Sequence, residues 1–199
     1  MDRNNRLDEI LQVNGNFIDA KEYEKYQTTK FPDKRLVILS CMDTRLVGLL
    51  EQAMGIEQGQ AIMIKVAGGQ VRDPFGSVMQ SILVAVHMLQ ADEVVVVAHH
   101  DCGMQCLHQD AFIEKLKERG VSEHSIQLAE RTGIKFNRWL DNFDNVYDNV
   151  VASANTIANH PLLAECGIPV HGLVINPHNG KLEQVVNGYQ YRFKLDGVL

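Results

Sequence analysis

The sequence predicts an α/β fold: a mainly parallel central β-sheet flanked by helices, with an N-terminal helical arm and an antiparallel edge strand. Apolar runs of strand length recur at residues 35–41, 61–66 and 93–98, and segments with helical patterns lie between them. Strands that alternate with helices are typical of a parallel sheet. Because these runs are apolar throughout, the strands are expected to be buried on both faces.

The N-terminal arm is predicted at residues 1–30. Residues 7–26 place apolar side chains near the period of about 3.6 residues that is typical of an α-helix. Gly15 lies inside this segment and is expected to bend or split the helix. The turn Phe-Pro-Asp at residues 31–33 then leads into the first strand.

The next elements are predicted from the glycine residues that follow them as much as from hydrophobic periodicity. A short helix is expected at residues 46–54, because Gly55 follows it as a terminator. The second strand, residues 61–66, opens into Ala-Gly-Gly at residues 67–69, which is expected to be a flexible loop. A helix at residues 77–89 is then expected to pack on the sheet before the third strand.

The C-terminal half is predicted to begin with helices and to end with strands. Residues 109–159 are mostly helical by composition, with breaks expected near Gly120 and Gly133. A fourth strand, a turn and an antiparallel return are expected last, at residues 170–175, 177–180 and 182–186.

Composition narrows the class of protein. At 199 residues the chain is expected to form a single domain, residues 1–199. A formal net charge of −6 argues against a nucleic-acid partner, because such binding relies on Lys and Arg. No apolar stretch suits a membrane span, and the first residues lack the apolar core of a secretory signal. Four cysteines do not suggest a disulfide scaffold, so a reducing cytoplasm is the expected location.

Reactive side chains follow two of the predicted strands. Cys41, Asp43 and Arg45 end the first run, and His99 and Cys102 end the third. In open α/β sheets the ligand site lies beyond the carboxyl ends of the strands, so these side chains are expected to meet there. Residues two apart in an extended chain point the same way, which would bring Cys41, Asp43 and Arg45 to one side.

Cys41, His99 and Cys102 are a plausible set of zinc ligands. Three protein ligands leave a fourth position for water, which is typical of a catalytic zinc site. Asp43 would lie beside the metal, and the planar guanidinium of Arg45 would hold it. Alternatively, Asp43 is a fourth ligand that closes a purely structural site. Cysteine and histidine at strand ends are also common as ordinary core residues.

These motifs resemble those of the β-class carbonic anhydrases. That family carries Cys-x-Asp-x-Arg followed by His-x-x-Cys, and both patterns stand here, at residues 41–45 and 99–102. The similarity is clearest over residues 36–104 and is greatest to the smaller bacterial and archaeal branch. Its further matches are Ala-Gly-Gly at 67–69 and Asp-Cys-Gly-Met at 101–104, and its departures are Val66, Ala98 and His100.

The resemblance implies a Zn²⁺ enzyme that interconverts carbon dioxide and bicarbonate. A zinc-bound hydroxide, oriented by Asp43 and Arg45, would attack carbon dioxide. From their position in the chain, and not from the resemblance, Gly103 and the segment around the Ala-Gly-Gly turn are expected to contact the substrate. The expected substrate-binding residues are therefore Val66, Ala67, Gly68, Gly69 and Gly103.

The resemblance also implies an oligomer and leaves two other functions open. A homodimer or a dimer of dimers is expected, with the N-terminal helix packing against the partner subunit. A closed state, in which Asp43 binds zinc directly, is expected at lower pH. The alternatives are a non-catalytic zinc-binding protein capped by Asp43, and a hydrolase of a related substrate such as carbon disulfide or carbonyl sulfide. Cys106 and Cys166 are expected to be packing residues.

Overall fold

The computed structural model describes residues 5–105, 107–140 and 142–190. The chain separates into two compact units, of which the first ends at Lys30 and the second begins at Phe31. The predicted arm corresponds to the first unit, and the single domain over residues 1–199 stays a prediction. Within the described residues, every helix is too short or too polar to cross a bilayer.

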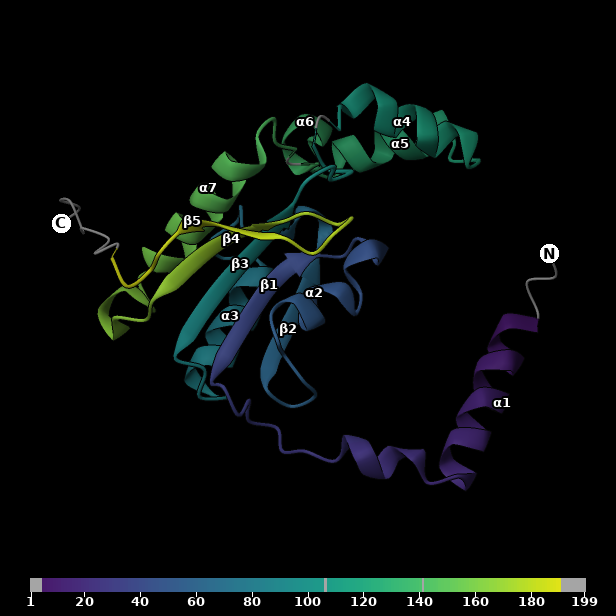
Figure 1. Cartoon of the computed structure of the whole chain (residues 1–199). Helices are drawn as coiled ribbons and strands as arrows, with labels where there is room; N and C mark the ends of the chain where they lie inside the picture. Colours follow the sequence, from purple (N-terminus) through teal and green to yellow (C-terminus); the bar gives the residue numbers. More distant parts are fainter. Residues whose placement is uncertain (1–4, 106, 141, 191–199) are drawn as a thin grey trace. The chain divides into compact units, whose positions relative to one another are not determined.

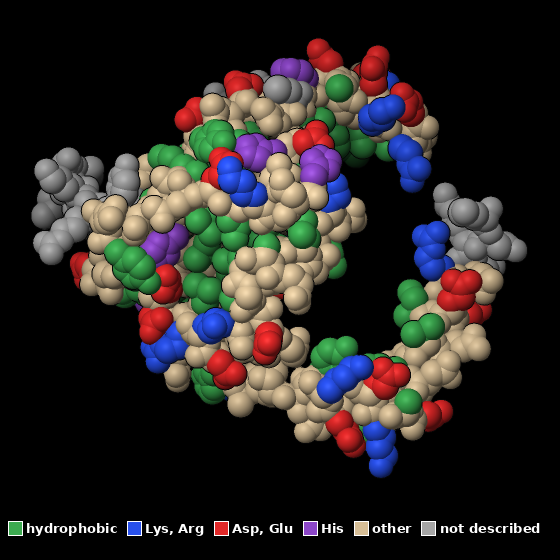
Figure 2. Space-filling view, in the orientation of Figure 1, with side chains coloured by type: hydrophobic (Ala, Val, Ile, Leu, Met, Phe, Trp, Pro, Cys, Tyr) green, Lys and Arg blue, Asp and Glu red, His purple; other side chains and the backbone are tan. Residues whose placement is uncertain are grey.

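The first unit is helical, as predicted, but its break lies elsewhere. Helix α1, Asn5–Asp19, runs through Gly15 without interruption, and the 3₁₀-helix η1, Glu22–Tyr26, follows it. The two are separated at Lys21, whose φ of 53° is left-handed. None of the residues of α1 is buried, and Figure 2 shows hydrophobic side chains exposed among the charged ones of this arm.

The second unit is built on a five-stranded sheet of order β2-β1-β3-β4-β5 (Figure 1). The first four strands are parallel, and β5 pairs antiparallel with β4 at the edge. This confirms the predicted fold class. The bounds are Leu36–Cys41 for β1, Ala61–Val66 for β2, Glu93–His99 for β3, Val170–Ile175 for β4 and Leu182–Val186 for β5.

Helices lie on both faces of the sheet and beyond one of its ends (Figure 1). The breaks predicted near Gly120 and Gly133 are present, since the helices on either side end and begin there. The helix predicted at residues 46–54 is shorter, because Gly48, at φ 79°, separates it from a 3₁₀-turn. The α-helices are α2 (Leu49–Ala53), α3 (Ser77–His87), α4 (Gln109–Glu118), α5 (Glu123–Arg131), α6 (Phe136–Trp139) and α7 (Val146–Ala158). The 3₁₀-helices are η2 (Thr44–Leu46), η3 (Ala67–Gly69) and η4 (Ala164–Cys166).

Strand β3 is packed against the core on both faces of the sheet. Val94 and Val96 enter the core cluster beneath α3 and α7, whereas Val95 and Val97 enter the cluster on the opposite face, beneath α2. All four side chains are buried. Burial of each such apolar side chain contributes roughly 1.5–3 kcal/mol of stability. The ends of β1 and β3 are thus fixed in space by packing on both sides.

The Ala-Gly-Gly segment is a packed turn, not the flexible loop that was expected. It forms η3, and both Gly68 and Gly69 are buried. Gly69 has a φ of 60°, and a Cβ atom there would lie 2.8 Å from the backbone nitrogen of Cys41. Only glycine allows this turn to approach the end of β1 so closely.

Candidate metal centre and its pocket

The predicted ligands converge where two neighbouring strands end. Cys41 and His99 are the last residues of β1 and β3, which pair in parallel. Cys102 follows in a turn that reverses at Asp101, whose φ of 56° is left-handed. All three side chains are buried, and their ligand atoms lie within 4.8 Å of one another.

The separations and partners of these atoms suit a tetrahedral metal ion. Two sulfurs at about 2.3 Å from zinc in tetrahedral geometry lie about 3.8 Å apart, and Cys41 Sγ is 3.9 Å from Cys102 Sγ. His99 Nδ1 donates a hydrogen bond of 2.8 Å to the carbonyl of His100, which leaves Nε2 with the lone pair. Within the described residues that buried Nε2 has no hydrogen-bond partner. A metal ion would satisfy it.

The two thiols influence each other strongly. The hydrogen bond from the Cys102 thiol lowers the pKa of Cys41 to about 4, although burial opposes this effect. The same hydrogen bond raises the pKa of Cys102. The pair therefore shares one proton, and a divalent cation is the species that would let both sulfurs ionise.

Asp43 lies beside the three ligands, but its backbone conformation differs from the extended chain that the sequence predicted. The strand ends at Cys41, and Asp43 caps the 3₁₀-turn η2 instead of continuing the extended chain. Its Oδ1 accepts hydrogen bonds from the Arg45 backbone nitrogen at 2.9 Å and from Arg45 Nε at 3.0 Å, and its Oδ2 accepts one from Nη2 at 2.8 Å. The Arg45 guanidinium holds the pKa of Asp43 well below its usual range. Asp43 therefore stays ionised at neutral pH.

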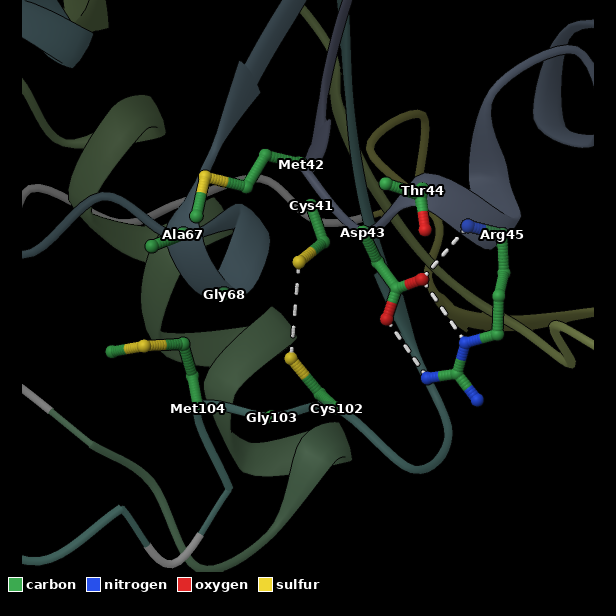
Figure 3. Close-up of a pocket in the computed structure, with 10 residues that line it drawn as sticks. All are labelled: Cys41, Met42, Asp43, Thr44, Arg45, Ala67, Gly68, Cys102, Gly103 and Met104. Atoms are coloured by element: carbon green, nitrogen blue, oxygen red, sulfur yellow. Dashed lines mark hydrogen bonds and ion pairs between the residues drawn. The ribbon is translucent and has the colours of Figure 1, made fainter. Parts of the chain in front are cut away.

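A pocket of about 460 Å³ opens over these groups (Figure 3). In the figure the two sulfurs point towards each other, and the Asp43 carboxylate lies beside them, with Arg45 on the side of Asp43 away from the sulfurs. Met42, Ala67 and Met104 lie on the other side of the sulfurs and make that wall apolar. The remaining lining residues are Thr44, Gly68 and Gly103.

Comparison with known proteins assigns the family. The family profile "Carbonic anhydrase" matches residues 36–182, which include all of the groups described above. The chain belongs to the β-carbonic anhydrase family. The protein "Putative carbonic anhydrase YtiB" of Bacillus subtilis is 52% identical over 183 residues, 92% of this chain and 97% of that one.

Two other proteins are similar to this chain. The crystal structure of β-carbonic anhydrase isoform I from Trichomonas vaginalis superposes with a TM-score of 0.83 at 31% identity, over 92% of this chain and 99% of that one. A protein named carbon disulfide hydrolase, from Acidithiobacillus thiooxidans, is 24% identical over 181 residues, 86% of this chain and 87% of that one.

The structure places some of the expected substrate-contacting residues of this family member away from the pocket. Ala67, Gly68 and Gly103 line it, but Val66 and Gly69 do not. Val66 packs against the core cluster beneath α3 and α7, because it is the last residue of β2 and its side chain points to that face. Gly69 faces the backbone of Cys41.

Several residues at the site of this family member were given no role from the sequence. Asp101 also holds Arg45: its Oδ2 and its carbonyl accept hydrogen bonds from Nη1 at 2.7 Å and Nη2 at 2.8 Å. In the sequence, Asp101 stood out only as the first residue of the Asp-Cys-Gly-Met match at residues 101–104. Met42 lies inside the first motif and Met104 ends the Asp-Cys-Gly-Met match, but neither was given a role. Cys106 lies outside the described residues, and Cys166 is exposed, so its predicted packing role is wrong.

Proposed function

We propose that this β-carbonic anhydrase family member catalyses the reversible hydration of carbon dioxide to bicarbonate and a proton, with Zn²⁺ held by Cys41, His99 and Cys102. The observation that carries this proposal is the cluster of three buried ligand atoms beside an intact Asp43–Arg45 pair. A bound zinc ion supplies Lewis acidity, which makes hydroxide available near neutral pH. The side chains around it would orient the nucleophile and form the wall of the substrate pocket.

Asp43 is the residue that would orient the nucleophile. Its Oδ2 lies 3.8 Å from His99 Nε2, so one carboxylate oxygen faces the ligand set. Its Oδ1 is occupied by two donors from Arg45. The oxygen that faces the ligands can accept a hydrogen bond from a hydroxyl group and turn the lone pair of that group towards carbon dioxide.

The same contacts favour an open site over one capped by Asp43. Binding of Asp43 to the metal would turn its carboxylate away from Arg45, and three hydrogen bonds would be lost or weakened. Such charge-assisted hydrogen bonds are about twice as strong as neutral ones. The Arg45 side chain is itself held by Asp101, so it cannot simply follow.

The apolar wall suits a small molecule without charge. Met42, Ala67 and Met104 offer no hydrogen-bond donor to a substrate, which matches carbon dioxide. Carbon disulfide is also linear, apolar and open to attack at its central carbon. Because a relative at 24% identity is named carbon disulfide hydrolase, hydrolysis of that compound is the second candidate function.

Stopped-flow hydration of carbon dioxide by zinc-loaded protein tests the proposal. We expect catalysis that disappears when a chelator removes the metal and returns when zinc is restored. Consumption of carbon disulfide, measured on the same preparation, separates the two candidates. A zinc-replete protein that leaves the hydration of carbon dioxide at the uncatalysed rate would eliminate the first candidate.

We also propose a homodimer, or a dimer of dimers, in which the arm packs against a second copy. Leu7, Ile10 and Leu11 lie on α1 and are each about 60% exposed. An isolated helix of this length is marginal in water and needs a surface against which to bury such side chains. In sedimentation velocity we expect the double variant Leu7→Asp/Leu11→Asp to dissociate and Asp8→Asn, on the same helix, to stay associated. A wild-type monomer at micromolar concentration would contradict the proposal.

The proposed location is the cytoplasm, where reducing conditions keep Cys41 and Cys102 as thiols. No partner beyond the substrate and a second copy is proposed. In particular, the net charge of −6 gives no support to nucleic-acid binding.

A further inference from the structure

The guanidinium of Arg45 is bonded on two edges. Its Nε and Nη2 donate to the two oxygens of the Asp43 carboxylate, at 3.0 Å and 2.8 Å. Its Nη1 donates to Asp101 Oδ2 at 2.7 Å, and Nη2 donates a second time, to the Asp101 carbonyl, at 2.8 Å. Figure 3 shows the third nitrogen, Nη1, pointing away from Asp43. Because the group is planar and rigid, these four contacts fix its orientation.

The contact with Asp101 joins the two segments that carry the proposed ligands. Arg45 lies on η2, shortly after β1 ends at Cys41. Asp101 lies in the turn after β3, directly before Cys102. The guanidinium therefore links the turn that follows one ligand to the turn that carries another. Since Arg45 also holds Asp43, the place of this carboxylate beside the ligands depends on both turns.

The shape of the turn does not by itself account for an aspartate at residue 101. The φ of Asp101 is 56°, a left-handed conformation that glycine adopts with less strain than any residue with a Cβ atom. A glycine would also keep the carbonyl that accepts from Arg45 Nη2. What aspartate adds is the carboxylate that accepts from Nη1. A hydrogen bond between two charged groups is stronger than one between neutral groups.

We propose that Asp101 is a positioning residue, which holds the Arg45 guanidinium in the orientation that keeps one oxygen of Asp43 turned towards the ligands. The inference rests on the proposed function, because it concerns the residue proposed to orient the nucleophile. Asp43 Oδ2 lies 3.8 Å from His99 Nε2, and it accepts a hydrogen bond from Arg45 Nη2. If the guanidinium tilts when its contact with the Asp101 carboxylate is lost, that oxygen is displaced with it.

Side-chain ¹⁵N NMR of the zinc-loaded protein tests this without any need for turnover. The Arg45 signals are identified by their absence from Arg45→Ala. We expect slow exchange between Nη1 and Nη2 in the wild type, because rotation of the guanidinium must break bonds on both edges. In Asp101→Gly we expect exchange about tenfold faster, the factor that corresponds to one lost hydrogen bond between charged groups. Asp101→Asn, which keeps an acceptor oxygen and tolerates the same φ, is expected to lie between the two.

Rates of hydration on the same preparations test the functional consequence. We expect Asp101→Gly to keep its zinc and to lower kcat/KM by about 10- to 100-fold, the usual effect of losing an outer contact at a metal site. Asp101→Asn is expected to recover part of that loss. In the Arg45→Ala background, Asp101→Gly is expected to cause no further loss, because it acts only through this guanidinium.

Asp92→Asn is the matched control, since it breaks another exposed ion pair between aspartate and arginine, the one with Arg35. We expect it to leave both the Arg45 signals and the rate as in the wild type. Exchange at the wild-type rate in Asp101→Gly, a full rate of hydration in that variant, or an equal loss of rate in the Arg45→Ala background would overturn the proposal. Failure of hydration in the wild type would count against the proposed function but would leave the NMR comparison intact.

Discussion

Replacement of Asp43 by asparagine is expected to slow the hydration of carbon dioxide by about 10²–10⁴-fold, the usual effect of losing a positioned acid–base group. Asparagine keeps the size of the side chain, and its oxygen can still accept from the Arg45 backbone nitrogen. The second carboxylate oxygen, which faces His99, becomes a donor. That NH₂ group also opposes Arg45 Nη2, itself a donor. The orienting acceptor is lost while the ligands stay in place.

Stopped-flow rates and metal analysis on the same preparation distinguish the roles of Asp43. The rate is expected to fall while zinc stays bound in full. Asp92→Asn provides the control, because Asp92 forms an exposed ion pair with Arg35 far from the pocket and its loss should leave the rate unchanged. An Asp43→Asn variant with full rate would refute the orienting role. A variant that has lost its zinc would instead show that Asp43 is a ligand.

The sequence predicted the positions of those site residues that lie at the ends of strands. Cys41 and His99 follow apolar runs, and neighbouring parallel strands end at one edge, so their meeting follows from topology. The position of Asp43 beside Cys41 was predicted correctly, but the backbone conformation assumed for it was wrong. An extended chain was assumed after Cys41, whereas Asp43 caps a tight turn through its own side chain. An aspartate followed by short-range turn residues commonly forms such a cap.

Contacts made by distant segments could not be predicted. Asn149 reaches Gly68 from α7, and nothing in the local pattern of either segment refers to the other. Val66 is different, because alternation along β2 places its side chain on the core face, and this could have been predicted from the strand pattern. Helix breaks at Gly48 and Lys21 depend on backbone conformations that composition leaves undetermined. Tertiary packing decides these features.

Replacement of Cys102 by serine is expected to abolish zinc binding and to lower stability. A serine hydroxyl does not ionise near neutral pH, and its oxygen is a harder ligand that reaches less far than sulfur. Two ligands, Cys41 and His99, would remain for an ion that normally takes three or four. Because zinc binds the folded chain, free zinc at 100 times its dissociation constant stabilises the wild type by about 2.7 kcal/mol. The variant should show no such gain.

Thermal unfolding with and without zinc, together with metal content, measures both effects. The wild type should melt at a higher temperature when zinc is added, and Cys102→Ser should melt at the same temperature in either case. Cys166→Ser is the control for loss of a thiol, since Cys166 is exposed on η4 and is not part of the cluster of ligand atoms. It should bind zinc as the wild type does. Stoichiometric zinc in purified Cys102→Ser would refute the proposed role of Cys102 as a ligand that zinc binding requires.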